Sequence, residues 1–253
     1  MSKINQIIDD WPLNAVLTSK WLQERGISRQ LADSYVKSGW LERFGNGAYK
    51  RTNQQINWFG GLYSLQKVCG LNVHAAGKTA LELHGYAHYL RKDARQSVLL
   101  WKSPGTRLPA WFINNEWKEK IHIRSVNLFD DAVIQLTNKE INGVTVGVSV
   151  AEQAVLEYLY DIPKYESFDE ATYIMEGLVS LRPSVLQTLL EDCRSVKVKR
   201  LFLYIAEYYN HPWFKRLDRS KMDLGSGKRE IIKGGKLDAS YQIVVPEIQR
   251  EDR

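Results

Sequence analysis

Hydrophobic residues recur at helical spacing in three short stretches near the start of the chain. Residues 3–10 carry isoleucines at this spacing and are followed by a tryptophan and a proline, which predicts a first helix. We expect a second helix at residues 19–25, because Gly26 suits the left-handed position after a helix. Ser28 is a favoured N-cap for a third helix. Since only about three residues separate the last two helices, the pattern is typical of a helix-turn-helix.

The hydrophobic spacing changes from helical to alternating after Gly39. Short alternating runs flank the turn Gly45-Asn46-Gly47, and an Asn-Gly pair between such runs is a strong hairpin signal because both turn residues need positive φ. The helices and the hairpin together predict a winged helix-turn-helix whose wing is the hairpin. Its core is expected to contain Trp21, Leu22, Leu31, Tyr35, Val36, Trp40 and Leu41. The residues left on the outside of the third helix are Arg29, Gln30, Asp33, Ser34 and Lys37.

The remaining chain predicts a larger domain with a sheet in its middle and helices toward its end. We expect a connecting helix at 54–69 that is interrupted at Gly60-Gly61, and another in the first half of 72–91 that ends at Gly85. Strands are expected at 97–101, 121–126, 133–136 and, after an Asn142-Gly143 turn, at 144–148. Helices are expected at about 150–160, 168–180, 184–193 and 196–209. The first three follow Ser149, Ser167 and Ser184, each with the Ser-x-x-Glu/Gln spacing of a capping box.

These patterns predict an α+β protein of two domains. The first is a winged helix-turn-helix at residues 1–53, and the second is a mixed α/β domain at residues 54–253. A chain of 253 residues is long enough for both domains to bury a core. The two cysteines, Cys69 and Cys193, are far apart and predict reduced thiols, and no apolar stretch is long enough for a signal region or a membrane span. We therefore expect a cytoplasmic protein without a membrane partner.

The net charge of +6 is concentrated in two stretches of the chain. Residues 19–51 contain seven lysines and arginines against three acids, and residues 194–236 contain twelve against four. Both surpluses permit contact with a phosphate backbone. In the second stretch the candidates for backbone contact are Lys197, Lys199, Arg200, Lys215 and Arg216. The alternative for that stretch is a solvated helix surface, and the alternative for the winged unit is a role in protein contacts only.

Three short patterns suggest catalysis or metal binding, but each is incomplete. His84 and His88 have the spacing of two metal ligands on a helix, but Gly85 lies between them and no third ligand is near. Glu116-Trp117-Lys118 matches half of a metal-dependent nuclease motif, whose other carboxylate should lie on a preceding strand, whereas Asp93 lies in a charged loop. Residues 225–229 resemble the end of a phosphate-binding loop but lack its first glycine and its hydroxyl residue. We assign no catalytic residue, metal site or cofactor.

The stretch from Gly26 through the wing to Tyr49 resembles the N-terminal domain of the AbiEi family, the antitoxins of type IV toxin–antitoxin and phage-abortive systems. Residues 74–90 and 149–157 are similar to this family as well, so the resemblance covers most of the chain. It implies a transcriptional repressor that binds inverted repeats in its own promoter on double-stranded DNA. It also implies an antitoxin that counteracts a nucleotidyltransferase toxin without forming a stable complex with it.

Carried onto this sequence, the family resemblance assigns DNA contacts to the third helix and the wing. The residues are Ser28, Arg29, Gln30, Ser34 and Lys37 on the helix, with Arg43, Asn46, Lys50 and Arg51 on the wing. Asp33 would repel phosphate unless it faces a cytosine amine or an arginine. The resemblance assigns no residue to the antitoxin activity. Two other functions stay open at this stage: a DNA-targeted metal-dependent nuclease, and a regulator with a ligand-sensing second domain.

Overall fold

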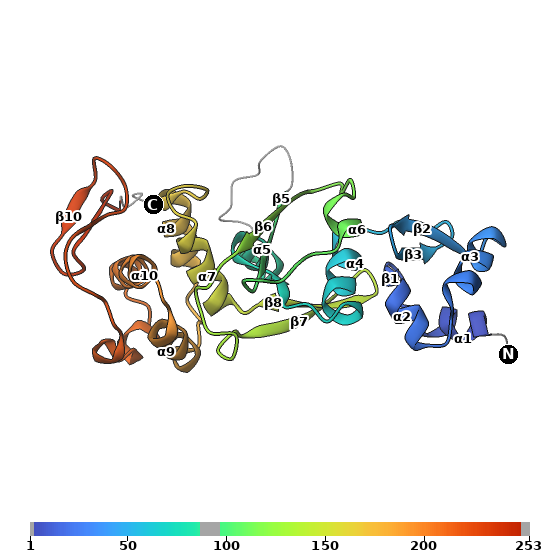
Figure 1. Ribbon diagram of the computed structural model, residues 1–253. Helices are drawn as coiled ribbons and strands as arrows, with labels where there is room; N and C mark the ends of the chain where they lie inside the picture. The colour runs from blue at the N-terminus through green and yellow to red at the C-terminus, as the bar shows by residue number, and fades with distance from the viewer. Residues whose placement is uncertain (1–2, 87–96, 249–253) are drawn as a thin grey trace. The chain divides into compact units, whose positions relative to one another are not determined.

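The computed structural model describes residues 3–86 and 97–248 of the chain (Figure 1). It is an α+β protein, as the sequence predicts. The chain forms two compact units. Unit 1 contains residues 1–74, 100–125 and 137–148, and unit 2 contains residues 75–99, 126–136 and 149–253. In the described part of the chain, no helix is both long and apolar enough to cross a membrane.

Unit 1 begins with the winged helix-turn-helix. Its elements are α1 (Lys3–Asp10), β1 (Leu17–Thr18), α2 (Ser19–Glu24), α3 (Arg29–Lys37), β2 (Leu41–Gly45) and β3 (Ala48–Arg51). The three strands form an antiparallel sheet of order β1-β3-β2. As the sequence predicts, Gly26 has a left-handed φ of 74° after α2, and the Ser28 hydroxyl caps α3 by accepting from the Leu31 N–H at 3.2 Å. Local signals therefore set the boundaries of the helix-turn-helix.

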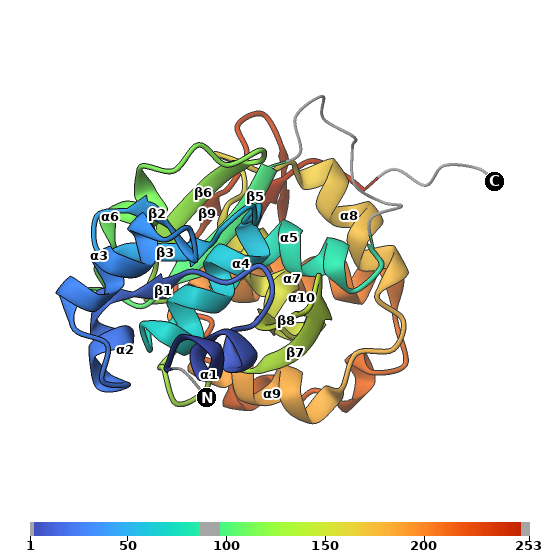
Figure 2. The ribbon, with the colours of Figure 1, turned by 90° about the vertical axis from the view of Figure 1, so that its right-hand side faces the viewer.

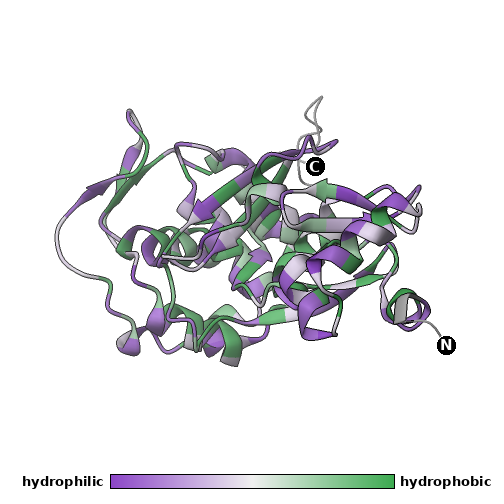
Figure 3. Cartoon of the chain, turned by 45° about the vertical axis from the view of Figure 1, so that its right-hand side comes forward, coloured by the Kyte–Doolittle hydropathy of each residue, from purple (hydrophilic) through white to green (hydrophobic). Residues whose placement is uncertain are grey.

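The core of the winged unit is built from all three helices and the hairpin. Figure 3 shows both hydrophobic and hydrophilic residues in α1, next to the N label, and Ile7 of this helix is buried in the core. The buried residues of this core are Ile7, Trp11, Ala15, Leu17, Leu22, Ile27, Ala32, Leu41 and Tyr49. Trp21, Leu31, Tyr35 and Val36 pack against them, partly buried. The predicted core membership of Trp40 is wrong, because Trp40 is 48% exposed at the turn between α3 and β2.

After the winged helix-turn-helix, the chain forms α4 (Trp58–Tyr63), which continues as a π-helix at Ser64–Val68. The prediction that Gly60-Gly61 interrupts this helix is wrong, since both glycines lie inside it. A side chain at Gly60 would overlap the carbonyl oxygen of Asn14, and one at Gly61 would overlap the Trp117 ring. These glycines therefore permit close packing of the helix against distant parts of the chain.

Five further strands form a sheet of order β6-β5-β4-β8-β7. They are β4 (Val73–Ala75), β5 (Ser97–Lys102), β6 (Lys120–Ser125), β7 (Leu136–Ile141) and β8 (Val144–Ser149), and the short helix α6 (Ala110–Ile113) lies between β5 and β6. The strand predicted at 133–136 forms later, at 136–141, and the first residues of the helix predicted from 72 are β4. Asn142 and Gly143 connect β7 to β8 with φ values of 51° and 77°, the two positive angles that an Asn-Gly hairpin turn needs.

Unit 2 contains most of the longer helices. Its elements include α5 (Gly77–Leu83), α7 (Ala151–Tyr160), α8 (Phe168–Gly177), α9 (Pro183–Asp192) and α10 (Val196–Tyr209). Helix α7 is buried from residue 152 to residue 159 and packs against the other four helices of this set (Figure 2). Short 3-10 helices at Phe214–Arg216 and Arg219–Lys221 precede a small sheet of order β10-β11-β9, formed by β9 (Arg229–Glu230), β10 (Lys236–Asp238) and β11 (Ile243–Val245).

The three predicted capping boxes have different outcomes. Ser167 is the N-cap of α8, as predicted. The N-cap of α7 is Val150, and Ser149 instead donates to the Glu157 carboxylate at 3.0 Å. The N-cap of α9 is Arg182, because Pro183 is suited to the first helical position. A capping-box spacing thus locates a helix start to within two residues, but of these three serines only Ser167 caps its helix with its side chain.

Candidate nucleic-acid interface

The outer face of α3 is an exposed polar surface of the winged unit. Ala32 on its inner face is 2% exposed and anchors the helix to the core. The predicted contact residues Ser28, Arg29, Gln30, Ser34 and Lys37 are all exposed or partly exposed. Side chains four residues apart lie on the same side of a helix. Arg29, Asp33 and Lys37 therefore form one row along α3, and Gln30 and Ser34 form a second row beside it.

The wing residue Arg43 reaches the first of these rows. Its Nη2 lies 2.6 Å from the Asp33 Oδ1, and the two side chains are 53% and 37% exposed. The guanidinium carbon also lies 5.9 Å from the centre of the Tyr49 ring, across the hairpin. The arginine that Asp33 needs as a partner is therefore present on the wing.

The other two cations of the wing are engaged in contacts inside unit 1. Lys50 forms a 2.9 Å ion pair with Glu42 and donates to the Gln54 carbonyl at 2.8 Å. The N–H of Asn53 and the Lys50 ammonium hold the pKa of Glu42 below its usual value. Arg51 donates to the main-chain carbonyls of Ile8 and Trp11 at the end of α1. Lys50 and Arg51 thus fix the hairpin in place, although the sequence pattern suggested DNA contacts for both.

The opposite face of the hairpin is covered by the segment around α6 (Figure 1). The Phe44 ring lies 6.0 Å from the Trp111 ring and 6.1 Å from the Trp117 ring, centre to centre. Gly45 approaches so closely that an added Cβ would lie 2.8 Å from the Trp111 Cβ. At the tip Asn46 is exposed, but only Gly47 has a positive φ, of 67°, so the prediction of two positive angles in this turn is wrong. Asn46 at the tip and Arg43 are therefore exposed residues of the wing that lie outside this contact.

The basic C-terminal stretch contains two kinds of cationic side chain: some are held inside the fold, and others are exposed to solvent. Lys199 and Arg200 are each 3% exposed, and Lys197 donates from a half-buried position to the carbonyls of Tyr160 and Ile162 at 2.6 Å each. We therefore correct the predicted backbone contacts at Lys197, Lys199 and Arg200, since Lys199 and Arg200 are buried and Lys197 bonds carbonyls of the fold. Lys215 and Arg216 are exposed on a 3-10 helix.

Arg200 is bonded to four carbonyl oxygens. They belong to Leu224, Gly225, Gly227 and Gln242, at 2.7, 3.1, 2.6 and 3.2 Å. Within the glycine-rich stretch 225–229, the carbonyls of Gly225 and Gly227 are consequently directed at the buried Arg200 guanidinium. A phosphate-binding loop needs its N–H groups directed at the ligand. The loop is therefore a structural clamp on Arg200.

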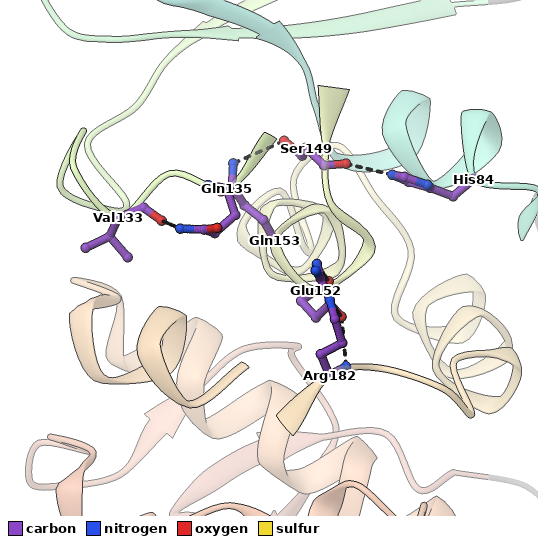
Figure 4. Close-up of polar contacts among 7 residues, drawn as sticks. All are labelled: His84, Val133, Gln135, Ser149, Glu152, Gln153 and Arg182. Carbon is purple, nitrogen blue, oxygen red and sulfur yellow. Dashed lines mark hydrogen bonds and ion pairs between the residues drawn. The ribbon is translucent and has the colours of Figure 1, made fainter. Parts of the chain in front are cut away.

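Unit 2 contains a network of polar contacts around the start of α7 (Figure 4). The Glu152 carboxylate accepts three hydrogen bonds from Arg182: from Nε at 3.0 Å, from Nη2 at 2.9 Å and from the backbone N–H at 2.8 Å. Burial alone would raise the pKa of Glu152, but these bonds outweigh it and hold the pKa below its usual value. The Gln153 amide oxygen accepts from the Gln135 N–H at 2.7 Å, and the ring of His84 bonds the Ser149 carbonyl at 2.8 Å.

A second polar cluster of unit 2 joins α5, α7 and α8. Lys78 lies 3.2 Å from the Glu170 carboxylate, which also accepts from the Tyr158 hydroxyl at 2.7 Å. Burial raises the pKa of the neighbouring Glu166 to about 7, although Lys78 acts to lower it. Sequence reasoning missed both clusters, because their members are distant in sequence and only the Ser-x-x-Glu spacing singled out Glu152 and Glu170.

Two of the three motifs considered for catalysis lie partly outside the described residues. Glu116 and Lys118 lie in a loop whose central residue, Trp117, packs against the Phe112 ring. His88 and Asp93 lie outside the described residues. Among the residues that are described, no group of three or more His, Cys, Asp or Glu side chains is placed to hold a metal ion.

The structure therefore defines a class of protein: an α+β chain that contains a winged helix-turn-helix with an exposed face on α3. Two family models match the chain over most of its length. One, described as the AbiEi antitoxin N-terminal domain of a transcriptional regulator, covers residues 1–92, and the other, described as a transcriptional regulator and AbiEi antitoxin of type IV toxin–antitoxin systems, covers residues 95–246. The chain belongs to the AbiEi family of antitoxin transcriptional regulators, which confirms the resemblance found in the sequence.

A solved structure has a similar fold. The crystal structure of the RV2827C protein from Mycobacterium tuberculosis matches with a TM-score of 0.59 at 14% sequence identity, over 95% of this chain and 89% of that one. At this identity the similarity shows the fold alone. No curated protein sequence matches this chain significantly.

Proposed function

We propose that the winged helix-turn-helix binds double-stranded DNA at inverted repeats in the promoter of its own operon and represses transcription there. The observation that supports this is the exposed face of α3, where Arg29, Gln30, Ser34 and Lys37 stand clear of the core. The first residues of a recognition helix lie against base edges in the major groove. Because Arg29 is the first residue of α3 and arginine pairs bidentately with guanine, it is the main candidate for base contact.

The proposed contact surface contains Ser28, Arg29, Gln30, Ser34, Lys37, Arg43 and Asn46. Lys50 and Arg51 act on DNA only through the position of the wing, since their side chains are held by Glu42 and by the end of α1. Lys215 and Arg216 are retained as candidates for additional backbone contact because both are exposed. This set of proposed DNA contacts omits those cations of the sequence-based set that are buried or bound to other groups of the protein.

A gel-shift titration of the full chain on its own promoter duplex, at several salt concentrations, tests the proposal. Arg29→Ala is expected to weaken binding by about 5- to 150-fold, equivalent to about 1–3 kcal/mol, with loss of preference at one base pair. Lys37→Ala should weaken binding to all sequences alike and reduce the salt slope by about one. Lys67→Ala, which removes the same charge from a position in the π-helix, is the matched control. Wild-type affinity and salt slope in both α3 variants would refute the DNA-binding surface.

We further propose that the chain counteracts a nucleotidyltransferase toxin encoded beside it, without a stable complex and without catalysis of its own. The support is the family model over residues 95–246, whose description includes the antitoxin role. Co-expression with the adjacent nucleotidyltransferase gene should restore growth, and size-exclusion chromatography of the two proteins should show separate peaks. Growth arrest despite expression of the chain would refute the antitoxin role, and co-elution would refute the absence of a complex.

A further inference from the structure

An acidic residue lies in the middle of the proposed DNA-contacting row of α3. Arg29, Asp33 and Lys37 follow each other at intervals of four residues and therefore lie on one side of the helix. An unpaired carboxylate between two cations would repel the phosphates on either side of a groove. The pairing of Asp33 with Arg43 at 2.6 Å removes this conflict, because it places a guanidinium over the carboxylate.

Two contacts hold Arg43 in this position. Its Nη2 donates to the Asp33 carboxylate, and its guanidinium carbon lies 5.9 Å from the Tyr49 ring centre. Tyr49 is 2% exposed and belongs to the core, so it provides a rigid support. The ion pair uses one of the five N–H donors of the guanidinium, and the Arg43 side chain is 53% exposed. Arg43 therefore keeps donors for a base edge while its position is set by the recognition helix.

We propose that Asp33 is a positioning residue for Arg43 and that the pair confers preference at one base pair beside those contacted by Arg29. This inference rests on the proposed DNA-binding function and deepens it. Asp33 contributes selectivity, since it holds the Arg43 guanidinium at a fixed point along α3. Without Asp33, Arg43 contacts the nearest phosphate, which strengthens binding to any sequence.

The alternative is an ion pair that only ties the wing to α3. Exposed ion pairs contribute little to stability, so Asp33→Asn is expected to fold and to unfold at the wild-type temperature. A structural role would change binding to all sequences alike. A positioning role changes the preference at one base pair and leaves the others as they are.

Selection of binding sites from a pool of random DNA duplexes tests the inference and identifies the preferred operator at the same time. Wild type, Arg29→Ala, Arg43→Ala, Asp33→Asn and Asp33→Glu are compared on the full chain. Arg43→Ala and Asp33→Asn should lose discrimination at the same base pair, by about 5- to 100-fold, and Arg29→Ala should lose it at a different one. Asp33→Glu, which keeps the carboxylate, should retain part of the preference. Asp33→Asn should also bind random duplex more tightly, with a salt slope steeper by about one.

The outcomes separate this inference from the function on which it rests. If the wild type selects a sequence that Asp33→Asn selects equally well, the positioning role is overturned while DNA binding stands. The positioning role is also overturned, with DNA binding unaffected, if Arg43→Ala keeps every base preference or if Asp33→Asn loses all preferences to the same extent. If the wild type selects no sequence at all, the proposed function and this inference both fail.

Discussion

Replacement of Arg200 tests whether this cation is a structural residue or a DNA contact. Its guanidinium donates to the carbonyls of Leu224, Gly225, Gly227 and Gln242 from a position that is 3% exposed. Arg200→Met keeps most of the aliphatic stem and removes all four hydrogen bonds. The substitution leaves the four carbonyl oxygens without their donor. It should therefore cost more than a substitution that replaces both partners of a buried polar pair with apolar groups.

The expected loss follows from the number of these bonds. At about 1 kcal/mol for each, and with water replacing the donor at some carbonyls of the exposed loop, the free energy of unfolding should fall by about 3–4 kcal/mol. For a protein of this size each kcal/mol corresponds to about 2–4 °C, so Tm should fall by roughly 6–16 °C. Circular dichroism during a thermal scan measures the shift.

Arg216→Met is the matched control, because Arg216 is exposed on the 3-10 helix and loses the same charge. Its Tm should stay within about 2 °C of the wild type. Gel shifts at a temperature where both variants are folded should show wild-type affinity for Arg200→Met. The structural assignment is refuted if Arg200→Met unfolds like the wild type, or if it weakens DNA binding while folded.

Two further changes test the packing of unit 1 and the buried acids of unit 2. Gly60→Ala should lower the free energy of unfolding by at least about 2 kcal/mol in a urea titration, because the new Cβ overlaps the Asn14 carbonyl. This loss is expected although alanine is favoured over glycine in helices by about 1 kcal/mol. A variant more stable than the wild type would contradict the close approach of Gly60 to Asn14. Burial, together with Glu170 and Asp161, raises the pKa of Glu166 to about 7 from its usual 4.5. Between these two pKa values the folded state binds a proton that the unfolded state releases. The protonated Glu166 therefore contributes to the free energy of unfolding, and this contribution is fully present below about pH 4.5 and lost as the pH rises through about 7. In urea titrations from pH 5 to 8, the free energy of unfolding should fall less for Glu166→Gln than for the wild type. If it falls equally with pH in both proteins, the raised pKa of Glu166 is contradicted.

The sequence alone determined the parts of the fold that depend on near neighbours. Gly26 ends α2 and Ser28 begins α3 because a left-handed φ and a capping hydroxyl act within a few residues. The helix expected at 196–209 has these bounds in the structure, since its apolar face and its breaker at residue 212 are local signals. The outward face of α3 followed from helical periodicity in the same way.

Only the tertiary structure decided which polar residues of the predicted site are available. The sequence shows Lys199 and Arg200 as members of a basic run, but the burial of Arg200 depends on residues that lie 24 to 42 positions away, such as Leu224 and Gln242. The partnership of Asp33 with Arg43 likewise depends on how the hairpin folds back over α3. Periodicity indicates the side of an element that a residue occupies. The partner on that side, and hence whether a charge contacts solvent, DNA or a carbonyl oxygen, is set by long-range packing.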